Sequence, residues 1–272
     1  MLPDFLKDYN LVWYDDFNGT SLDASKWNLK AEMREQCDLE LREDDSAISI
    51  DNGILILTSD RIDESSYYTN TSVSSRGRMS FNYGYVEIRA KLPFGKPAWP
   101  SFWMLADTEL NPTNTWQSEV DIFEVFGNDA KLSYNIHKWY RDGSGNHEQI
   151  VSRRKYDYDF NDKTEAEQWH TYGLLWTPQS FKFLVDGKVC EEMDITENGN
   201  FANDEYGMDG FHVPHYIIFN NYVYTKGFKG CETWAAGKEA TSVDKFPIKY
   251  YIDYVKLYKK TGEGDLIIYN NQ

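Results

Sequence analysis

Ser118-Glu119-Val120-Asp121-Ile122-Phe123-Glu124-Val125-Phe126 is a run of apolar, strand-forming residues into which three carboxylates are set. Because side chains alternate faces along a strand, Glu119 and Asp121 point the same way. Strict alternation would turn Glu124 to the opposite face, and one extra residue at Ile122-Phe123, taken up as a β-bulge, brings it back. The run therefore predicts a bulged strand that shows three acids on one face.

Segments on both sides of this run carry the same strand pattern. Period-2 alternation, with Gly, Asn or Asp at an edge, recurs at residues 53–58, 84–92, 181–188 and 250–258. Asp186-Gly187 suits the type I′ turn of a hairpin. Long helical periodicity is absent, and no strand pattern alternates with a helix pattern. The sequence thus predicts an all-β, antiparallel sandwich rather than an α/β fold.

The 272 residues are predicted to form one domain over residues 1–272. All-β sandwiches often run to this length as a single unit, and no internal repeat or low-complexity linker divides the chain. Residues 261–272 are either a loose tail or a last strand.

The formal net charge of −16 argues against nucleic acid or an anionic membrane as a partner, because phosphate binding needs a basic patch. No stretch approaches the length of a membrane span, and no basic region followed by an apolar one opens the chain. Either the protein stays in the cytoplasm or the numbering begins after a removed signal, and we expect a secreted or cell-surface protein. Cys37, Cys190 and Cys231 are too few and too scattered for a disulfide scaffold or a zinc site.

The spacing of the acids suits the cleavage of glycosidic bonds. Glutamate side chains at 119 and 124 are long enough to lean toward each other, and carboxyl groups about 5–5.5 Å apart are the geometry of a retaining glycosidase. Three carboxylates so close cannot all ionise at neutral pH, so one keeps a proton while another is free to attack. A calcium site, an exposed polar edge and half of an ion-pair ladder are the alternative interpretations.

Tryptophans flank the acids. Trp116 precedes the run by three residues, and Trp99 and Trp103 fall in a nearby strand-like segment. Sugar rings stack their apolar faces on indoles while their hydroxyls need polar partners, so acids beside tryptophans favour a carbohydrate cleft. Any single tryptophan is more typical of a core.

Glu119-Val120-Asp121-Ile122-Phe123-Glu124 resembles the E-x-D-x-x-E signature of glycoside hydrolase family 16, the laminarinase and lichenase family. The likeness extends in order over about residues 10–259. The further segments that carry it are Leu11–Gly19 with Leu22-Asp23 and Trp27, Tyr83–Pro93, Ala98–Leu105, Trp169–Pro178 ahead of the hairpin at Val185–Lys188, and Tyr251–Tyr258.

The resemblance implies an antiparallel β-jelly-roll sandwich with a substrate cleft across its concave sheet. It implies that Glu119 is the nucleophile, that Glu124 is the general acid/base and that Asp121 hydrogen-bonds the nucleophile. The residues expected to contact substrate are Trp116, Trp103, Trp99, His137 and Asn220. A purely structural role is equally open for His137.

The extra residue in the motif resembles laminarinases and the galactan-cleaving agarases and carrageenases, whereas strict lichenases and xyloglucan enzymes lack it. We favour a retaining endo-β-glucanase acting on neutral β-1,3- or mixed-linkage β-1,3-1,4-glucan, because a sulfated galactan would need cations and Arg153-Arg154-Lys155 is the main obvious cluster. The alternatives are an endo-acting galactanase, agarase or carrageenase, and a non-catalytic glycan-binding relative. Residues 33–40 and 219–224 depart from the family's usual cleft segments, which leaves the substrate open.

The reaction implied by the resemblance needs no cofactor. Family members often bind a structural calcium on the convex side, and Asp253 and the carbonyl of Gly53 match its ligands. Residues 157–168 lack the glycine and glutamate of an EF-hand loop, and residues 212–215 lack the further ligands of a zinc site. We expect a monomer whose partner is a polysaccharide.

Overall fold

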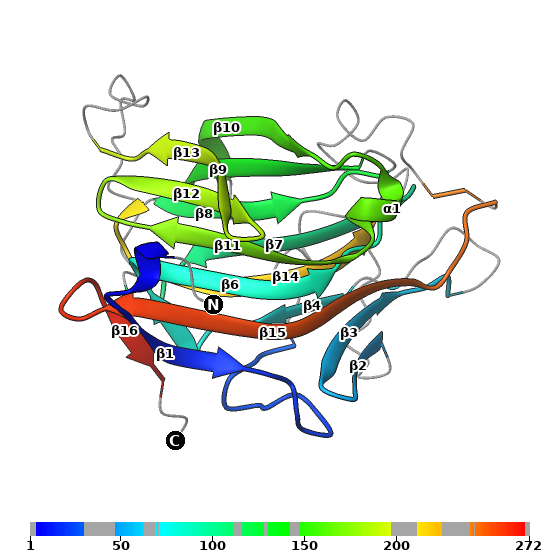
Figure 1. The fold of residues 1–272 in the computed structure, drawn as a ribbon, viewed down its shortest axis with the longest axis horizontal. Helices are drawn as coiled ribbons and strands as arrows, with labels where there is room; N and C mark the ends of the chain where they lie inside the picture. The colour runs from blue at the N-terminus through cyan, green and yellow to red at the C-terminus, as the bar shows by residue number, and fades with distance from the viewer. Residues whose placement is uncertain are drawn as a thin grey trace.

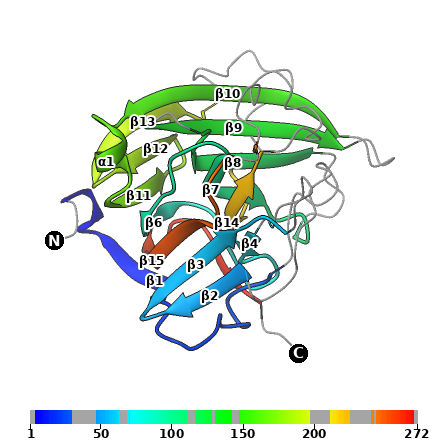
Figure 2. The same ribbon diagram turned by 90° about the vertical axis from the view of Figure 1, so that its right-hand side faces the viewer.

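The structure is a computed structural model, and it describes residues 4–29, 47–62, 69, 71–110, 116–127, 130–141, 147–196, 211–224, 240–241 and 243–269. These residues form two antiparallel sheets that pack face to face (Figures 1 and 2). Two short helices accompany them, the 3-10 helix η1 (Asp4–Leu6) and α1 (Lys163–Ala166). The predicted all-β sandwich is confirmed.

The first sheet, sheet A, has the order β13-β12-β11-β6-β15-β3-β2, and β1 also pairs with β15. Its strands are β1 (Tyr9–Asp15), β2 (Ile48–Asp51), β3 (Ile54–Ser59), β6 (Gly84–Lys91), β11 (Trp169–Trp176), β12 (Ser180–Val185), β13 (Lys188–Asp194) and β15 (Ile248–Lys260). Three of the four predicted strand segments thus appear as β3, β6 and β15, and the fourth as β12 with the start of its hairpin.

The second sheet, sheet B, has the order β10-β9-β8-β7-β14-β5-β16, and β4 also pairs with β14. Its strands are β4 (Thr71–Ser74), β5 (Met79–Phe81), β7 (Ala98–Ala106), β8 (Trp116–Glu124), β9 (Lys131–Arg141), β10 (His147–Asp159), β14 (His215–Val223) and β16 (Leu266–Ile268). Because Leu266 pairs with Phe81, the described part of the C-terminal segment holds a last strand.

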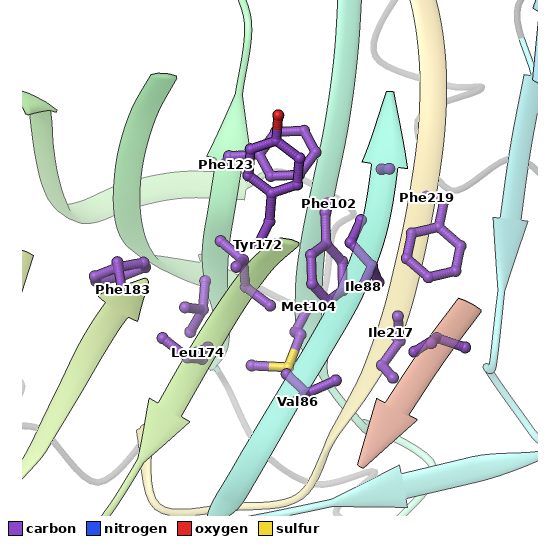
Figure 3. Close-up of a cluster of buried hydrophobic side chains, with 14 of the residues drawn as sticks. Val86, Ile88, Phe102, Met104, Phe123, Tyr172, Leu174, Phe183, Ile217 and Phe219 are labelled. Atoms are coloured by element: carbon purple, nitrogen blue, oxygen red, sulfur yellow. The ribbon is translucent and has the colours of Figure 1, made fainter. Parts of the chain in front are cut away.

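The core lies between the two sheets. Along β6, Val86, Ile88 and Ala90 are fully buried while Glu87, Arg89 and Lys91 are partly exposed, as period 2 requires. Figure 3 shows side chains of β6 and β11 meeting those of β7, β8 and β14 across this layer. Burying each large apolar side chain contributes about 1.5–3 kcal/mol to the free energy of unfolding, so this layer stabilises the packing of the two sheets.

The hairpin predicted at Asp186-Gly187 joins β12 to β13. Both residues have positive φ, 49° and 73°, as a type I′ turn demands, and Val185 pairs with Lys188 across it. Cys190, just beyond, is a partly buried free thiol, whereas Cys37 and Cys231 lie outside the described residues. Among the described helices, none has the length and hydropathy needed to span a membrane.

Candidate active site

The acids lie on β8, between β7 and β9 in sheet B. On the β7 side Phe123 pairs with Phe102 and Asp121 with Trp103, so Ile122 is an extra residue. The β9 register shifts over the same stretch. Both Ile122 and Phe123 are buried in the core, so Glu124 turns back to the face of Asp121. The predicted bulge is confirmed.

This face of β8 is the outer face of sheet B. Residues paired across neighbouring antiparallel strands share a face, so the register defines three rows of side chains. The rows are Glu119 with Leu105 and His137, Asp121 with Trp103 and Asn135, and Glu124 with Ser101, Ser133 and Asn220. A buried cluster separate from the main core lies on the same face and consists of Trp103, Leu105, Tyr216 and Ile218.

Glu119, Asp121 and His137 come together. One carboxylate oxygen of each acid and one imidazole nitrogen all lie within 4.8 Å of one another. Asp121 is only 3% exposed, and its Oδ2 lies 3.4 Å from His137 Nε2. Two carboxylates this close repel when both are ionised, and the imidazole of His137 lies beside them.

Glu124 is held by Trp99. The indole Nε1–H of Trp99 donates to Glu124 Oε1 at 3.0 Å, and the two side chains are 4% and 9% exposed. The indole stacks on Tyr224 with ring centroids 5.0 Å apart and planes 5° apart. With one face of its ring covered in this way, Trp99 is placed to orient the carboxyl group of Glu124.

Trp103 and Asn220 form a second pair. Trp103 Nε1–H donates to Asn220 Oδ1 at 2.6 Å, and Asn220 Nδ2 donates to Ser101 Oγ at 3.3 Å. Both members are nearly fully buried. The amide thus holds the indole beside the acids. Trp116 begins β8, and its side chain lies outside the described part of the structure, as do the side chains of residues 153–155 and the whole of residues 33–40.

Sequence reasoning missed Ser101, Ser133 and Asn135, which share rows with the acids. Every residue of β7 is buried, and apolar residues stand on both of its faces. Alternation of polar and apolar residues therefore does not single out Ser101. Only pairing with β8 reveals these residues, and pairing is a long-range property.

The predicted calcium ligands are Asp253 and the carbonyl of Gly53. Asp253 Oδ2 accepts a hydrogen bond from Arg89 Nη1 at 2.6 Å. A guanidinium on this carboxylate would repel a divalent cation bound there, so the contacts of Asp253 do not fit a calcium site. Across the described residues, the one group of three potential metal ligands is Glu119, Asp121 and His137 at the active site.

The model of the family Glycosyl hydrolases family 16 matches residues 25–227. Glucan endo-1,3-beta-glucosidase A1 of Niallia circulans is 27% identical over 92% of this chain and 38% of its own length. Keratan-sulfate endo-1,4-beta-galactosidase of Sphingobacterium multivorum is 26% identical over 93% of this chain and 56% of its own length.

Among solved structures, the laminarinase catalytic domain from Thermotoga maritima MSB8 superposes with a TM-score of 0.75. The match covers 94% of this chain and all of that one at 24% identity, and it shows a shared fold. The chain spans well under two thirds of the length of the two curated relatives described above.

Proposed function

Since the chain belongs to glycosyl hydrolase family 16, we propose that it is a retaining endo-β-glucanase that hydrolyses β-1,3- or mixed-linkage β-1,3-1,4-glucan. The observation that carries this proposal is the bulged strand β8, which turns Glu119, Asp121 and Glu124 to one outer face beside buried indoles. The name of the Niallia circulans relative supports the β-1,3 linkage.

In the first step of this proposal, Glu119 attacks the anomeric carbon while Glu124 protonates the glycosidic oxygen that leaves. The bond to the leaving sugar breaks as an ester to Glu119 forms. Glu124, now ionised, takes a proton from water, and that water displaces Glu119 from the anomeric carbon. Two inversions retain the β configuration.

The surrounding contacts suit these roles. A carboxylate oxygen of Asp121 lies within 4.8 Å of one of Glu119, and the His137 imidazole lies beside Asp121 from β9. Trp99 keeps Glu124 in one orientation through its N–H, which favours proton transfer at a defined oxygen. A lectin gains nothing from crowding three acids, so this arrangement argues against the non-catalytic alternative.

An endo-acting galactanase is the second candidate, because one relative is named a keratan-sulfate endo-1,4-beta-galactosidase. The described side chains in the rows beside the acids are serines, asparagines and apolar residues, apart from His137. This lack of cationic side chains in those rows argues against a sulfated substrate. A location outside the cell, a monomeric state and independence of any cofactor stay predictions.

The test incubates the protein with laminarin, mixed-linkage glucan and agarose and sizes the products. We expect short oligosaccharides from the glucans, and ¹H NMR of the first product should show the β-anomer. Glu119→Gln should abolish turnover, whereas Glu109→Gln, which removes an exposed carboxylate elsewhere, should leave it intact. Turnover of agarose alone would favour the galactanase, and an active Glu119→Gln variant would disprove the assigned nucleophile.

Azide separates the roles of the two glutamates. In Glu124→Gln, azide should restore cleavage of an aryl glucoside and yield a β-glycosyl azide, because the covalent step at Glu119 is intact. In Glu119→Gln, any product should be the α-azide formed by direct displacement. The reverse assignment of products would overturn the proposed roles.

A further inference from the structure

A cavity of about 580 Å³ lies at the end of the sandwich where α1 approaches the segment that enters β15 (Figure 1). Its described walls are formed by residues 91–98, by the α1 region and by residues 243–251. None of the three acids of β8 lines it. Lys91 points outward from sheet A, the sheet opposite the one that carries the acids. The cavity is therefore separate from the active site, and its volume is typical of ligand sites.

The lining of this cavity is basic in an acidic protein. Its charged residues are Lys91, Lys96, Lys163, Lys245 and Lys249 together with Glu167 and Asp244. These five lysines and two acids give the described lining a formal charge of +3, whereas the whole chain carries −16. A local positive potential against a negative background concentrates anions at one place.

The two acids of the lining are already engaged. Glu167 Oε1 lies 3.4 Å from Lys163 Nζ. Asp244 Oδ2 accepts hydrogen bonds from the backbone N–H of Thr241 at 2.6 Å and from its hydroxyl at 2.9 Å. Both carboxylates thus have partners of their own.

Within the part of the chain that the structure describes, three lysines of the cavity lack an acidic partner. No ion pair within the described ranges joins Lys91, Lys245 or Lys249 to a carboxylate, and Lys245 and Lys249 are exposed. Three ammonium groups that share one cavity and have no ion-pair partner among the described residues offer hydrogen-bond donors to an anion.

The rest of the lining suits a sugar ring. Tyr251 pairs with Lys91 across β15 and β6, so an aromatic ring stands beside an ammonium group. Pro93, Pro247 and Val243 add apolar surface. A nucleic acid needs an extended basic track along its backbone, and the strongly acidic remainder of this chain opposes one.

We propose that this lysine cavity binds an acidic sugar unit, sulfated or carboxylated, of a polysaccharide. The site holds the chain without taking part in bond cleavage. The inference goes beyond the glucanase function and does not depend on it, because binding is measured without turnover.

The test uses the full chain carrying Glu119→Gln and measures binding by affinity electrophoresis. The probes are polygalacturonate, iota-carrageenan, neutral laminarin and duplex DNA. Polygalacturonate and carrageenan distinguish a carboxylate from a sulfate as the recognised group. We expect retardation by at least one of these two probes that disappears in high salt, because exposed ammonium–anion pairs are screened.

The decisive variant is Lys91→Ala/Lys245→Ala/Lys249→Ala, which should bind the acidic polysaccharide about tenfold more weakly. The matched control Lys7→Ala/Lys188→Ala/Lys260→Ala removes the same charge from exposed positions elsewhere and should bind as the parent does. Circular dichroism reports folding, and Lys245→Gln/Lys249→Gln, at two exposed positions, serves if the triple variant misfolds.

Three results would overturn the proposal. The first is no binding of either acidic polysaccharide by the parent. The second is equal weakening in the cavity and control variants, which would indicate a general charge effect. The third is DNA binding of equal strength that is lost with the same three lysines, since the site would then read a polyphosphate rather than a sugar.

Discussion

Replacing His215 with glutamine should remove a defined part of the acid sensitivity of this fold. His215 begins β14 and is fully buried, with its ring edge-on to Trp176 at 5.1 Å. Nδ1 lies 2.7 Å from the carbonyl of Val213, and Nε2 lies 2.9 Å from the hydroxyl of Ser118. Since a carbonyl only accepts, Nδ1–H donates to it, and Nε2 of the neutral ring then accepts from Ser118.

Burial lowers the pKa of His215 to about 4, from a usual value of 6.5. The unfolded chain therefore binds a proton at higher pH than the folded one does. The stability that this neutral histidine contributes is fully present above about pH 6.5 and is lost as pH falls toward about 4. Between about pH 7.5 and about pH 5 the linkage amounts to about 2 kcal/mol.

Urea unfolding at these two pH values measures the effect. The wild type should lose about 2 kcal/mol more than His215→Gln between them, because other titrating groups cancel in the comparison. His212 is a matched control, since it is only partly buried and bonds Tyr83 and the carbonyl of Ile195. Comparing His215→Gln with His212→Gln separates the loss of the buried ring from the loss of an imidazole as such. Equal losses in wild type and His215→Gln would refute the reasoning.

Three further substitutions test the site and the packing. Trp99→Phe keeps a ring in place but removes the donor to Glu124, so kcat/KM on the preferred glucan should fall about tenfold, and an unchanged value would contradict an orienting role. Asn220→Ala leaves a buried indole N–H without its acceptor and should cost about 1–3 kcal/mol in urea unfolding; a wild-type midpoint would argue against this bond. Gly173→Ala places a Cβ 2.6 Å from the hydroxyl of buried Tyr85, so stability should drop by about 1–3 kcal/mol, and a wild-type melting temperature would show that the ring yields freely.

Local patterns in the sequence were sufficient to predict several of the strands and the three acids. Alternation predicted β3, β6 and β15, and two residues with positive φ at Asp186-Gly187 form the predicted hairpin. The bulge at Ile122 also followed from the sequence, because only one extra residue turns Glu124 to the face of Asp121. Side-chain direction in a strand depends on neighbours in the chain, so these features are readable without partners.

The surroundings of the acids depended on strand pairing. His137 reaches Asp121 because β9 pairs with β8 in one register, and a slip of one residue would turn His137 to the opposite face. Trp99 meets Glu124 across 25 positions of sequence, and Asn220 meets Trp103 across 117.

The lysine cavity is likewise a product of tertiary structure. It draws its walls from three segments separated by about 65 residues or more, and nothing in any one of them marks a site. Alternation and turn chemistry act between neighbouring residues, whereas register and cavity shape arise when the two sheets bury their inner faces together. The sequence therefore carried the acids and their strand, and only the packed sandwich supplied the groups that orient them.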